Sequence, residues 1–247
     1  MICKLCQKNR KLIKAHIIPD WLHEEFYDEK HFIQNVNVYN KNKISKLPTG
    51  EYDENILCKD CDGAILSNYE NEGKRFYEYF VKHYFNINFN IIRELESLNY
   101  LSIDYANHNQ VYLFFLSILW RMHISKRSNY TNVNLHYKLA EKLRKSLLFS
   151  NFKIIDYIPI IVAHYLNDSD VKLKIITNTP IVHENGIINI ILNGLIVTFV
   201  PQKDLIIEDR SKLFFKGNKL QILEYEPGKI KPFLDYLLGL DIYKHIL

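Results

Sequence analysis

The chain has 247 residues, of which 47% are hydrophobic and 24% charged, a composition typical of a globular protein with one large domain or a small domain plus appendages. Its formal net charge of +4 permits an anionic partner but does not require one, because dedicated nucleic-acid-binding domains are often more basic. The sequence has no signal-peptide pattern, and its longest apolar stretch, Tyr112 to Trp120, is too short to span a bilayer. We therefore expect a cytoplasmic protein without a membrane partner.

The four cysteines lie in two CxxC pairs, Cys3 with Cys6 and Cys58 with Cys61. In a reducing compartment two such pairs favour zinc over disulfides, because zinc binds four thiolates tetrahedrally. The second pair follows a short apolar run and precedes a helical pattern. We predict a structural Zn²⁺ held by the four cysteines in a treble clef, which consists of a knuckle, a hairpin and a helix.

Residues 66–150 are expected to be mainly helical. From Ala64 to Tyr84 aromatic residues recur at roughly helical spacing, and Val111 to Ile124 is apolar nearly all round, which predicts a buried central helix. Asn134 to Phe149 is amphipathic, with leucines every four residues and a basic opposite side.

Residues 151–247 are expected to be rich in strands. Lys153 to Tyr165 and Val171 to Thr177 are rich in Ile and Val. Three turn signals, Glu-Asn-Gly at 184–186, Leu-Asn-Gly at 192–194 and Gly-Asn at 217–218, separate apolar runs. A final helix is predicted from Pro232 to His245.

Together these patterns predict an α+β fold in three regions. Residues 1–65 would form the zinc-bound treble clef, in which a polar stretch with a Pro-Thr-Gly turn signal makes a loop or short hairpin. Residues 66–150 would be the helical region, and residues 151–247 an antiparallel β-rich region with a C-terminal helix.

The order CxxC, then His-Ile-Ile-Pro from His16, then Asn-Ile-Leu-Cys-x-x-Cys from Asn55, resembles the HNH (ββα-metal) endonucleases with an embedded zinc site. It is also similar to uncharacterised bacterial HNH-like proteins. The resemblance covers the N-terminal quarter of the chain. It implies an HNH-like ββα module in which His16 ends the first hairpin strand, Asn55 precedes the second cysteine pair and Asp62 holds the last site position.

The chemistry of such a site explains these residue types. A neutral imidazole at His16 would take a proton from the water that attacks phosphorus, and Asn55 would orient that imidazole. Mg²⁺ or another divalent cation would stabilise the departing oxyanion, with Asp62 and Glu70 as ligands. Asp20 is a further nearby carboxylate. Two residues depart from the family pattern: Ala15 replaces a usual ligand before the histidine, and Asp62 replaces His or Asn.

Structural readings of the same residues remain open. His16 would then cap a strand or support the zinc knuckle, Asn55 would be a turn residue and Asp62 a helix N-cap. Arg121 lies on an apolar helix between Ser117 and Ser125, and either binds phosphate or, as is more usual, pairs with an acid from another element. Basic residues that would contact a DNA or RNA backbone, or merely face solvent, are Lys74, Arg75, Lys138, Lys142, Arg144 and Lys145.

The resulting hypothesis is an HNH-like, metal-dependent endonuclease that cleaves phosphodiester bonds in DNA or RNA. The family resemblance implies a bacterial role in phage defence or a mobile element. The alternative is a non-catalytic, zinc-stabilised module that binds nucleic acid or protein and whose nuclease site has decayed, which Ala15 favours. A sensor or toxin-like effector acting through residues 151–247 is a third hypothesis, and that region would also serve a protein partner or homo-oligomer.

Overall fold

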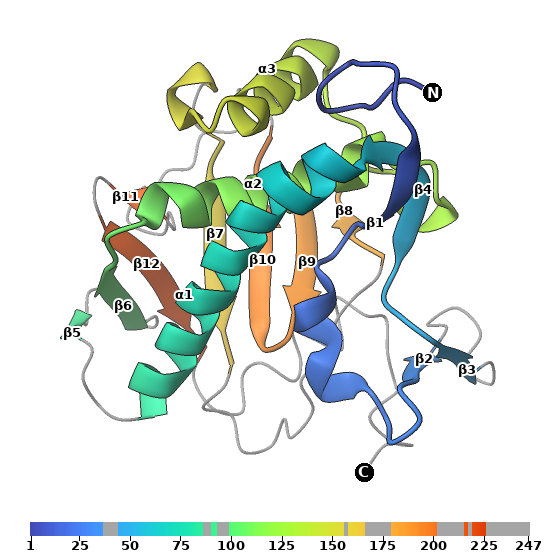
Figure 1. The fold of residues 1–247 in the computed structure, drawn as a ribbon. Helices are drawn as coiled ribbons and strands as arrows, with labels where there is room; N and C mark the ends of the chain where they lie inside the picture. The colour runs from blue at the N-terminus through green and yellow to red at the C-terminus, as the bar shows by residue number, and fades with distance from the viewer. Residues whose placement is uncertain are drawn as a thin grey trace.

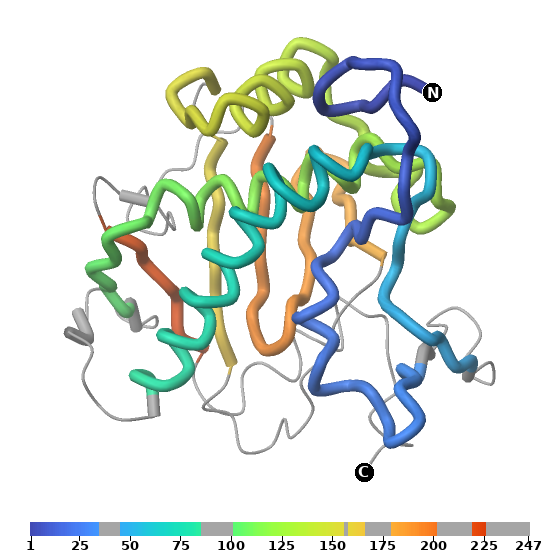
Figure 2. The backbone as a smooth tube through the Cα atoms, in the orientation of Figure 1, coloured from blue at the N-terminus to red at the C-terminus, as the bar shows by residue number. Residues whose placement is uncertain are grey.

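The computed structural model describes residues 1–36, 44–85, 90–92, 99–155, 158–165, 179–201, 215–216 and 219–225. A mixed α+β architecture is evident, as the sequence predicts: small N-terminal sheets stand beside a group of helices, and the helices cross one face of a larger sheet (Figures 1 and 2). None of the helices in these residues combines the length and hydrophobicity needed to cross a membrane.

The N-terminal region is organised by an antiparallel pair of strands, β1 (Leu12–His16) and β4 (Tyr52–Cys58). The pairing register shifts between Ile13 and Ala15, so the last two residues of β1 are displaced along β4. Between these strands the chain forms the 3₁₀ segment η1 (Asp20–Phe26) and a second hairpin, β2 (Ile33–Val36) with β3 (Ile44–Leu47). Of the two forms expected for this stretch, a loop or a short hairpin, the structure has the hairpin.

A π-helical turn, η2 (Cys61–Leu66), leads from β4 directly into helix α1 (Ser67–Phe85). Helix α2 (His108–Ile124) is buried from Val111 through Met122, and helix α3 (Tyr137–Leu148) follows a 3₁₀ turn, η3 (Ser128–Tyr130). A last 3₁₀ turn, η4 (Phe152–Ile154), leads to the sheet. All three predicted helices are confirmed, and the apolar run of α2 forms the centre of the molecule, as its all-round hydrophobicity indicates.

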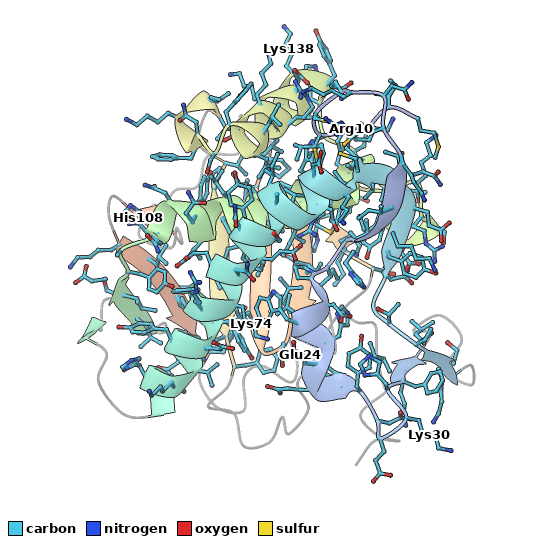
Figure 3. All side chains as sticks on the ribbon, in the orientation of Figure 1. Arg10, Glu24, Lys30, Lys74, His108 and Lys138 are labelled. Carbon is cyan, nitrogen blue, oxygen red and sulfur yellow. The ribbon has the colours of Figure 1, made fainter. Side chains whose placement is uncertain are left out.

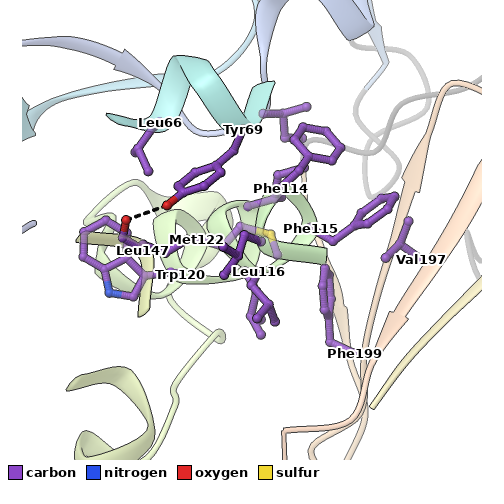
Figure 4. Close-up of a cluster of buried hydrophobic side chains, with 14 of the residues drawn as sticks. Leu66, Tyr69, Phe114, Phe115, Leu116, Trp120, Met122, Leu147, Val197 and Phe199 are labelled. Atoms are coloured by element: carbon purple, nitrogen blue, oxygen red, sulfur yellow. Dashed lines mark hydrogen bonds between the residues drawn. The ribbon is translucent and has the colours of Figure 1, made fainter. Parts of the chain in front are cut away.

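The core lies where α2 packs between α1 and the sheet. Figure 4 shows Phe115 of α2 directed toward Val197 and Phe199, and the Tyr69 hydroxyl of α1 donating a hydrogen bond of 2.7 Å to the Leu147 carbonyl of α3. On the α1 side, Gly73 faces the ring of Phe114 so closely that a β-carbon there would lie 2.6 Å from its Cγ and Cδ2 atoms. The missing side chain at Gly73 thus sets how closely α1 crosses α2.

The larger sheet has the order β5-β6-β12-β7-β10-β9-β8, with β11 paired to β12. Its strands are β5 (Asn90–Ile92), β6 (Asn99–Asp104), β7 (Ile160–His164), β8 (Ile181–Val182), β9 (Ile188–Leu192), β10 (Leu195–Phe199), β11 (Phe215–Lys216) and β12 (Lys219–Glu224). Strands β5 and β6 belong to the stretch expected to be helical, so the sheet joins strands from both sides of the predicted boundary at residue 150.

The sheet is mixed and not purely antiparallel, which corrects the prediction for the β-rich region. Strand β12 runs antiparallel to β6 but parallel to β7, its other neighbour. Parallel neighbours need a long connection, and β8 to β11 lie between β7 and β12 in the chain. Turn signals predict adjacent hairpins, but they carry no information on such a distant pairing.

The predicted turns behave as their residue types require. Asn193 and Gly194 have φ values of 47° and 87° and join β9 to β10, which matches the positive φ of a type I′ hairpin turn. Gly186, between β8 and β9, also has a positive φ of 77°. The predicted strand from Val171 to Thr177, the Gly-Asn turn at 217–218 and the helix from Pro232 to His245 lie outside the described residues.

Candidate metal centre and the surroundings of His16

The two CxxC pairs meet at one point. Cys3 and Cys6 lie in the N-terminal loop, Cys58 ends β4 and Cys61 begins η2, and the four sulfur atoms lie within 4.8 Å of one another. Tetrahedral zinc with Zn–S bonds of about 2.3 Å places its sulfurs ~3.8 Å apart, so the cluster fits Zn²⁺. None of the four forms a disulfide. The predicted four-cysteine cluster is confirmed as a plausible zinc site.

The chain around the sulfurs has the geometry of a zinc knuckle. Gln7 adopts a left-handed φ of 59°, which lets its N–H reach the Cys3 carbonyl at 2.9 Å. The Cys58 N–H points at the Cys3 sulfur at 3.4 Å, as backbone amides do toward a metal-bound thiolate. Burial raises the pKa of the Cys3 and Cys61 thiols, so a cation is needed to keep them as thiolates.

Arg144 of α3 supports this knuckle from outside. Its Nη1 donates a hydrogen bond of 2.6 Å to the Leu5 carbonyl, between the first two cysteines, and its other nitrogens bind Glu141 at 2.7 and 2.8 Å. The guanidinium predicted to contact nucleic acid is therefore engaged in holding the knuckle against α3.

His16 lies at the end of β1 with about a third of its side chain exposed. Its Nε2 lies 2.9 Å from the Thr49 hydroxyl oxygen, and that hydroxyl donates to Asp20 Oδ1 at 3.2 Å. The same Asp20 oxygen accepts a hydrogen bond of 2.6 Å from the Tyr27 hydroxyl. His16, Thr49 and Asp20 thus form a chain of polar contacts that fixes one edge of the imidazole.

The direction of these bonds determines the tautomer of a neutral His16. The Thr49 hydroxyl donates its one proton to the Asp20 carboxylate, so toward His16 its oxygen can only accept a hydrogen bond. The proton of a neutral His16 imidazole is therefore on Nε2. Nδ1 then carries the lone pair and is the nitrogen able to take a proton. Burial acts to raise the pKa of Asp20, but the Tyr27 hydrogen bond and the nearby His16 outweigh it, so this pKa lies below its usual value and Asp20 is ionised.

The buried side chain of Arg121 contacts the backbone of His16. Its side chain is fully buried, and its Nη1 donates to the His16 carbonyl at 2.8 Å and to Glu70 Oε1 at 2.5 Å. Its Nε also approaches the Ser117 carbonyl at 3.4 Å. The expectation that this arginine pairs with an acid from another element is confirmed, and the acid is Glu70.

Asp62 is near the same group of charges. Burial raises its pKa, the Arg121 guanidinium opposes that shift, and the charges of Glu70 and His16 also act on it. The structure therefore brings together His16, Asp62 and Glu70, three of the residues predicted for the catalytic site. In the described part of the chain, however, the cysteine cluster is the one group whose ligand atoms are already arranged for a metal. Ala15 is fully buried and offers no ligand.

Asn55 lies elsewhere on the hairpin. Tyr52, and not Asn55, is the residue of β4 opposite His16. Asn55 is exposed and lines a cavity of about 330 Å³ together with Met1, Leu12, Ile124 and Lys126. Its backbone N–H donates to Asp53, a buried carboxylate that also accepts from Ser125 and holds the C-terminal end of α2. The structure places Thr49, and not Asn55, against the imidazole.

The other basic residues have near neighbours of opposite charge or aromatic character. Lys74 binds both oxygens of Glu24 at 3.0 Å, Arg75 pairs with Glu72 at 3.3 Å, and Figure 3 shows Lys74 and Glu24 facing each other across α1 and η1. On α3, Lys145 lies 3.6 Å from Glu141, and Lys138 lies 5.9 Å from the ring centre of Tyr137. Lys142, also on α3, is only partly exposed.

The residue that sequence reasoning missed is Thr49. It lies in the Pro-Thr-Gly segment, which the sequence marks as a turn, more than thirty residues from His16. A threonine in a turn carries no signal of its own, and its contact with His16 depends on how β1 and β4 pair.

Comparison of the chain with protein-family models, with curated proteins and with solved structures finds no match to any of them.

Proposed function

We propose that the protein is an HNH-like, metal-dependent endonuclease that hydrolyses phosphodiester bonds in DNA or RNA, with His16 as the general base. The observation that carries the proposal is the contact chain from His16 through Thr49 to Asp20. It fixes the imidazole in one tautomer and leaves Nδ1 to take a proton from water.

The arrangement of strands and helix around His16 supports the same proposal. The knuckle, the β1–β4 hairpin and the helix that begins at Cys61 follow the order of a treble clef, with His16 at the end of its first strand. In this reading zinc has a structural role and stabilises the hairpin on which His16 lies.

The charges around His16 favour a bound divalent cation in this chemistry. Asp20, Asp62 and Glu70 are three carboxylates in the neighbourhood, with Arg121 as the buried counter-charge. A phosphodiester would be repelled by this acidic group unless a cation such as Mg²⁺ were bound. Asp62 and Glu70 are the residues that would hold it, and the cation would stabilise the leaving oxyanion.

The test is incubation of the purified protein with plasmid DNA and with RNA in Mg²⁺, Mn²⁺ or Ni²⁺. His16→Ala should reduce cleavage by about 10²–10⁴-fold, the usual contribution of a general base. Thr49→Val should also reduce it, because the imidazole would lose its acceptor, whereas Thr49→Ser should retain activity. His108→Ala is the matched control, because His108 begins α2 (Figure 3), about 20 Å along that helix from Arg121, which contacts the His16 carbonyl.

Equal cleavage by the wild-type protein and His16→Ala, or no cleavage with any of these metals, would falsify the proposal. Folding of each variant is checked by its zinc content and circular dichroism, so that loss of structure is not mistaken for loss of the base.

A second candidate is a zinc-stabilised module that binds nucleic acid or protein without cleaving it. Two observations favour it: Ala15 provides no ligand, and Glu70 is already bound to Arg121. Metal-independent binding by the wild-type protein, with no cleavage under any condition above, would support this candidate.

A further inference from the structure

The net charge of the chain is unevenly distributed. Residues 1–14 contain five Lys or Arg and no Asp or Glu, and residues 126–153 contain seven Lys or Arg and one Glu. These two segments therefore carry a net charge of +11, while the remainder of the chain carries −7, which together give the overall +4. The modest net charge of the whole chain therefore includes two strongly basic segments.

The two basic segments lie side by side. Arg144 of α3 binds the Leu5 carbonyl in the zinc knuckle, which joins the helix to the N-terminal loop directly. Figure 3 shows Arg10 and Lys138 at the same end of the molecule, and Figure 1 shows α3 beside the N-terminal loop. Of the acids at this end, Glu141 lies against Arg144 and 3.6 Å from Lys145, and Asp60 pairs with Arg10 at 2.8 Å.

The same end of the molecule exposes large apolar side chains. Among the residues that the structure describes, the exposed large hydrophobic residues are Met1, Ile2, Tyr137 and Phe149, and all four belong to the two basic segments. Tyr137 is 70% and Phe149 64% exposed. Aromatic rings exposed among cations offer flat stacking surfaces beside positive charge, the combination that proteins use to bind single-stranded nucleic acid.

The geometry of α3 places the rings and the lysines on one side. At 100° per residue, Tyr137, Lys138, Lys142, Lys145 and Phe149 share the half of the helix opposite the buried leucines. The two rings are ~18 Å apart along the axis, at either end of the lysines. This surface, with Lys8, Arg10 and Lys11 of the knuckle loop beside it, is called here the α3–knuckle face.

We propose that the α3–knuckle face binds single-stranded nucleic acid, with the cations along the phosphate backbone and Tyr137 and Phe149 as stacking platforms for bases. Unpaired bases offer their flat faces to aromatic side chains, whereas a duplex keeps them stacked inside. A basic surface with exposed rings therefore matches single strands better than duplex.

An anionic membrane fits the face less well. A helix that lies in a membrane surface needs a continuous apolar side for insertion. The apolar side of α3 is already used, because Leu143 and Leu147 are fully buried in the core. The two exposed rings lie at opposite ends of the helix with lysines between them, a spacing that suits separate bases along a strand.

This inference deepens the proposed function by naming its substrate class, but its test does not depend on cleavage. Binding of fluorescent oligonucleotides of DNA and RNA, single-stranded and duplex, is measured by anisotropy without added divalent metal and over a range of salt concentrations. His108→Ala, at the start of α2 and outside both the α3–knuckle face and the surroundings of His16, should bind like the wild-type protein. A failure of the nuclease proposal and a failure of this one therefore give different results.

The expected result is that the wild-type protein binds single strands at least tenfold more tightly than duplex. Tyr137→Ala and Phe149→Ala should each weaken single-strand binding by about fivefold or more, as loss of one stacked base does. The triple variant Lys138→Ala, Lys142→Ala, Lys145→Ala should reduce the slope of log affinity against log salt by about 2. Its control replaces three exposed lysines elsewhere: Lys30, Lys46 and Lys219.

Three outcomes would overturn the proposal. If the α3 triple variant and the control triple variant reduced the salt slope equally, any nucleic-acid contact would lie outside this face. Unchanged binding by both aromatic variants, or preference for duplex, would remove the stacking role. Binding to phosphatidylserine vesicles but not to oligonucleotides would identify the face as a membrane contact.

Discussion

Arg121 is the residue on which the geometry around His16 depends. Its buried guanidinium joins three elements, since it contacts the His16 carbonyl at the end of β1, Glu70 on α1 and Ser117 on its own helix. A buried cation without its partners destabilises the folded state, and so do buried acceptors that have lost their cation. The position of His16 relative to α1 is therefore set by an interaction that is chemically separate from any catalytic step.

Replacement of Arg121 by leucine should destabilise the protein by about 3–5 kcal/mol, because the His16 carbonyl and Glu70 lose their common donor. Arg75→Ala is the matched control: Arg75 is 70% exposed and pairs with Glu72 on the same helix, so its loss should cost less than about 1 kcal/mol. Urea unfolding of both variants measures the difference. Similar losses for the two arginines would show that Arg121 does not organise the site.

At this scale the sequence predicts residue types better than partners. His16 and the four cysteines stand out because of their spacing to one another, and an arginine on an apolar helix implies a buried acid. Asp20 is close to His16 in sequence, and its low pKa arises from Tyr27 and His16 acting together. The register shift after Ile13 brings Tyr52 opposite His16, where an unbroken register would have placed Glu54 beside Asn55, and no local pattern encodes this shift.

We expect the N-terminal hairpin to depend on zinc at the cysteine cluster for its stability. The buried residues of its two strands belong to the same hydrophobic core as the helices, and Cys58 and Cys61 lie at the junction with η2. Metal analysis should find one zinc per chain. Removal of zinc with a chelator, or Cys58→Ser, should expose the amides of β1 and β4 to rapid hydrogen exchange.

The amides of β9 and β10 serve as the internal control in that experiment, because both strands are buried in the large sheet. They should remain protected when the metal is removed. Protection of β1 and β4 that does not change on zinc removal would contradict a structural role for the metal.

The crossing of α1 over α2 is sensitive to a single methyl group. Gly73→Ala would normally stabilise a helix by up to ~1 kcal/mol. Here the new β-carbon would meet three ring atoms of Phe114 at 2.6–2.7 Å, so we expect a net destabilisation of about 1–3 kcal/mol. Gly63→Ala in η2 meets no atom within 4 Å and should be neutral or slightly stabilising. Thermal unfolding of the two variants gives the comparison, and equal midpoints would contradict the close packing.

Helices and hairpins follow from the sequence to the extent that their signals are local. The periodic apolar residues of α1, α2 and α3 and the Asn193-Gly194 turn are read within a window of a few residues. Strands β5 and β6 were not predicted, since they are short and lie between helices. Strand β6 is paired with β12, a contact between distant parts of the chain, and β5 is paired in turn with β6.

His164 links the stability of the whole molecule to pH. It is fully buried on β7 between the rings of Phe80 and Tyr84, and burial lowers its pKa to about 3. Glu224 Oε1 lies 3.9 Å from its Nε2, beyond hydrogen-bond distance, and already accepts from the Tyr84 hydroxyl, so burial dominates. The folded protein therefore keeps this imidazole neutral where the unfolded chain would protonate it.

The sign of the effect follows from this difference. The unfolded chain binds the extra proton below a pKa of about 6.5, so the stabilisation is complete above that pH and is lost as the pH falls toward 3. Between pH 7.5 and 5.5 His164 should contribute a loss of about 1.4 kcal/mol in unfolding free energy. Urea unfolding at both pH values measures this effect. Between pH 7.5 and 5.5 the unfolding free energy of His164→Gln should fall by about 1.4 kcal/mol less than that of the wild-type protein. Parallel pH profiles would contradict a neutral buried imidazole.

The position of β12 in the sheet has a consequence for synthesis of the chain. Strand β6 emerges from the ribosome long before β12, its partner, and β7 also has β12 on one side. Until β12 is made, β6 and β7 have no common neighbour, and their backbone edges remain open to incorrect partners. The sheet therefore stays incomplete until β12 is made, and premature termination before Lys219 would yield a product prone to aggregation, even though its four cysteines and helices α1 to α3 are present.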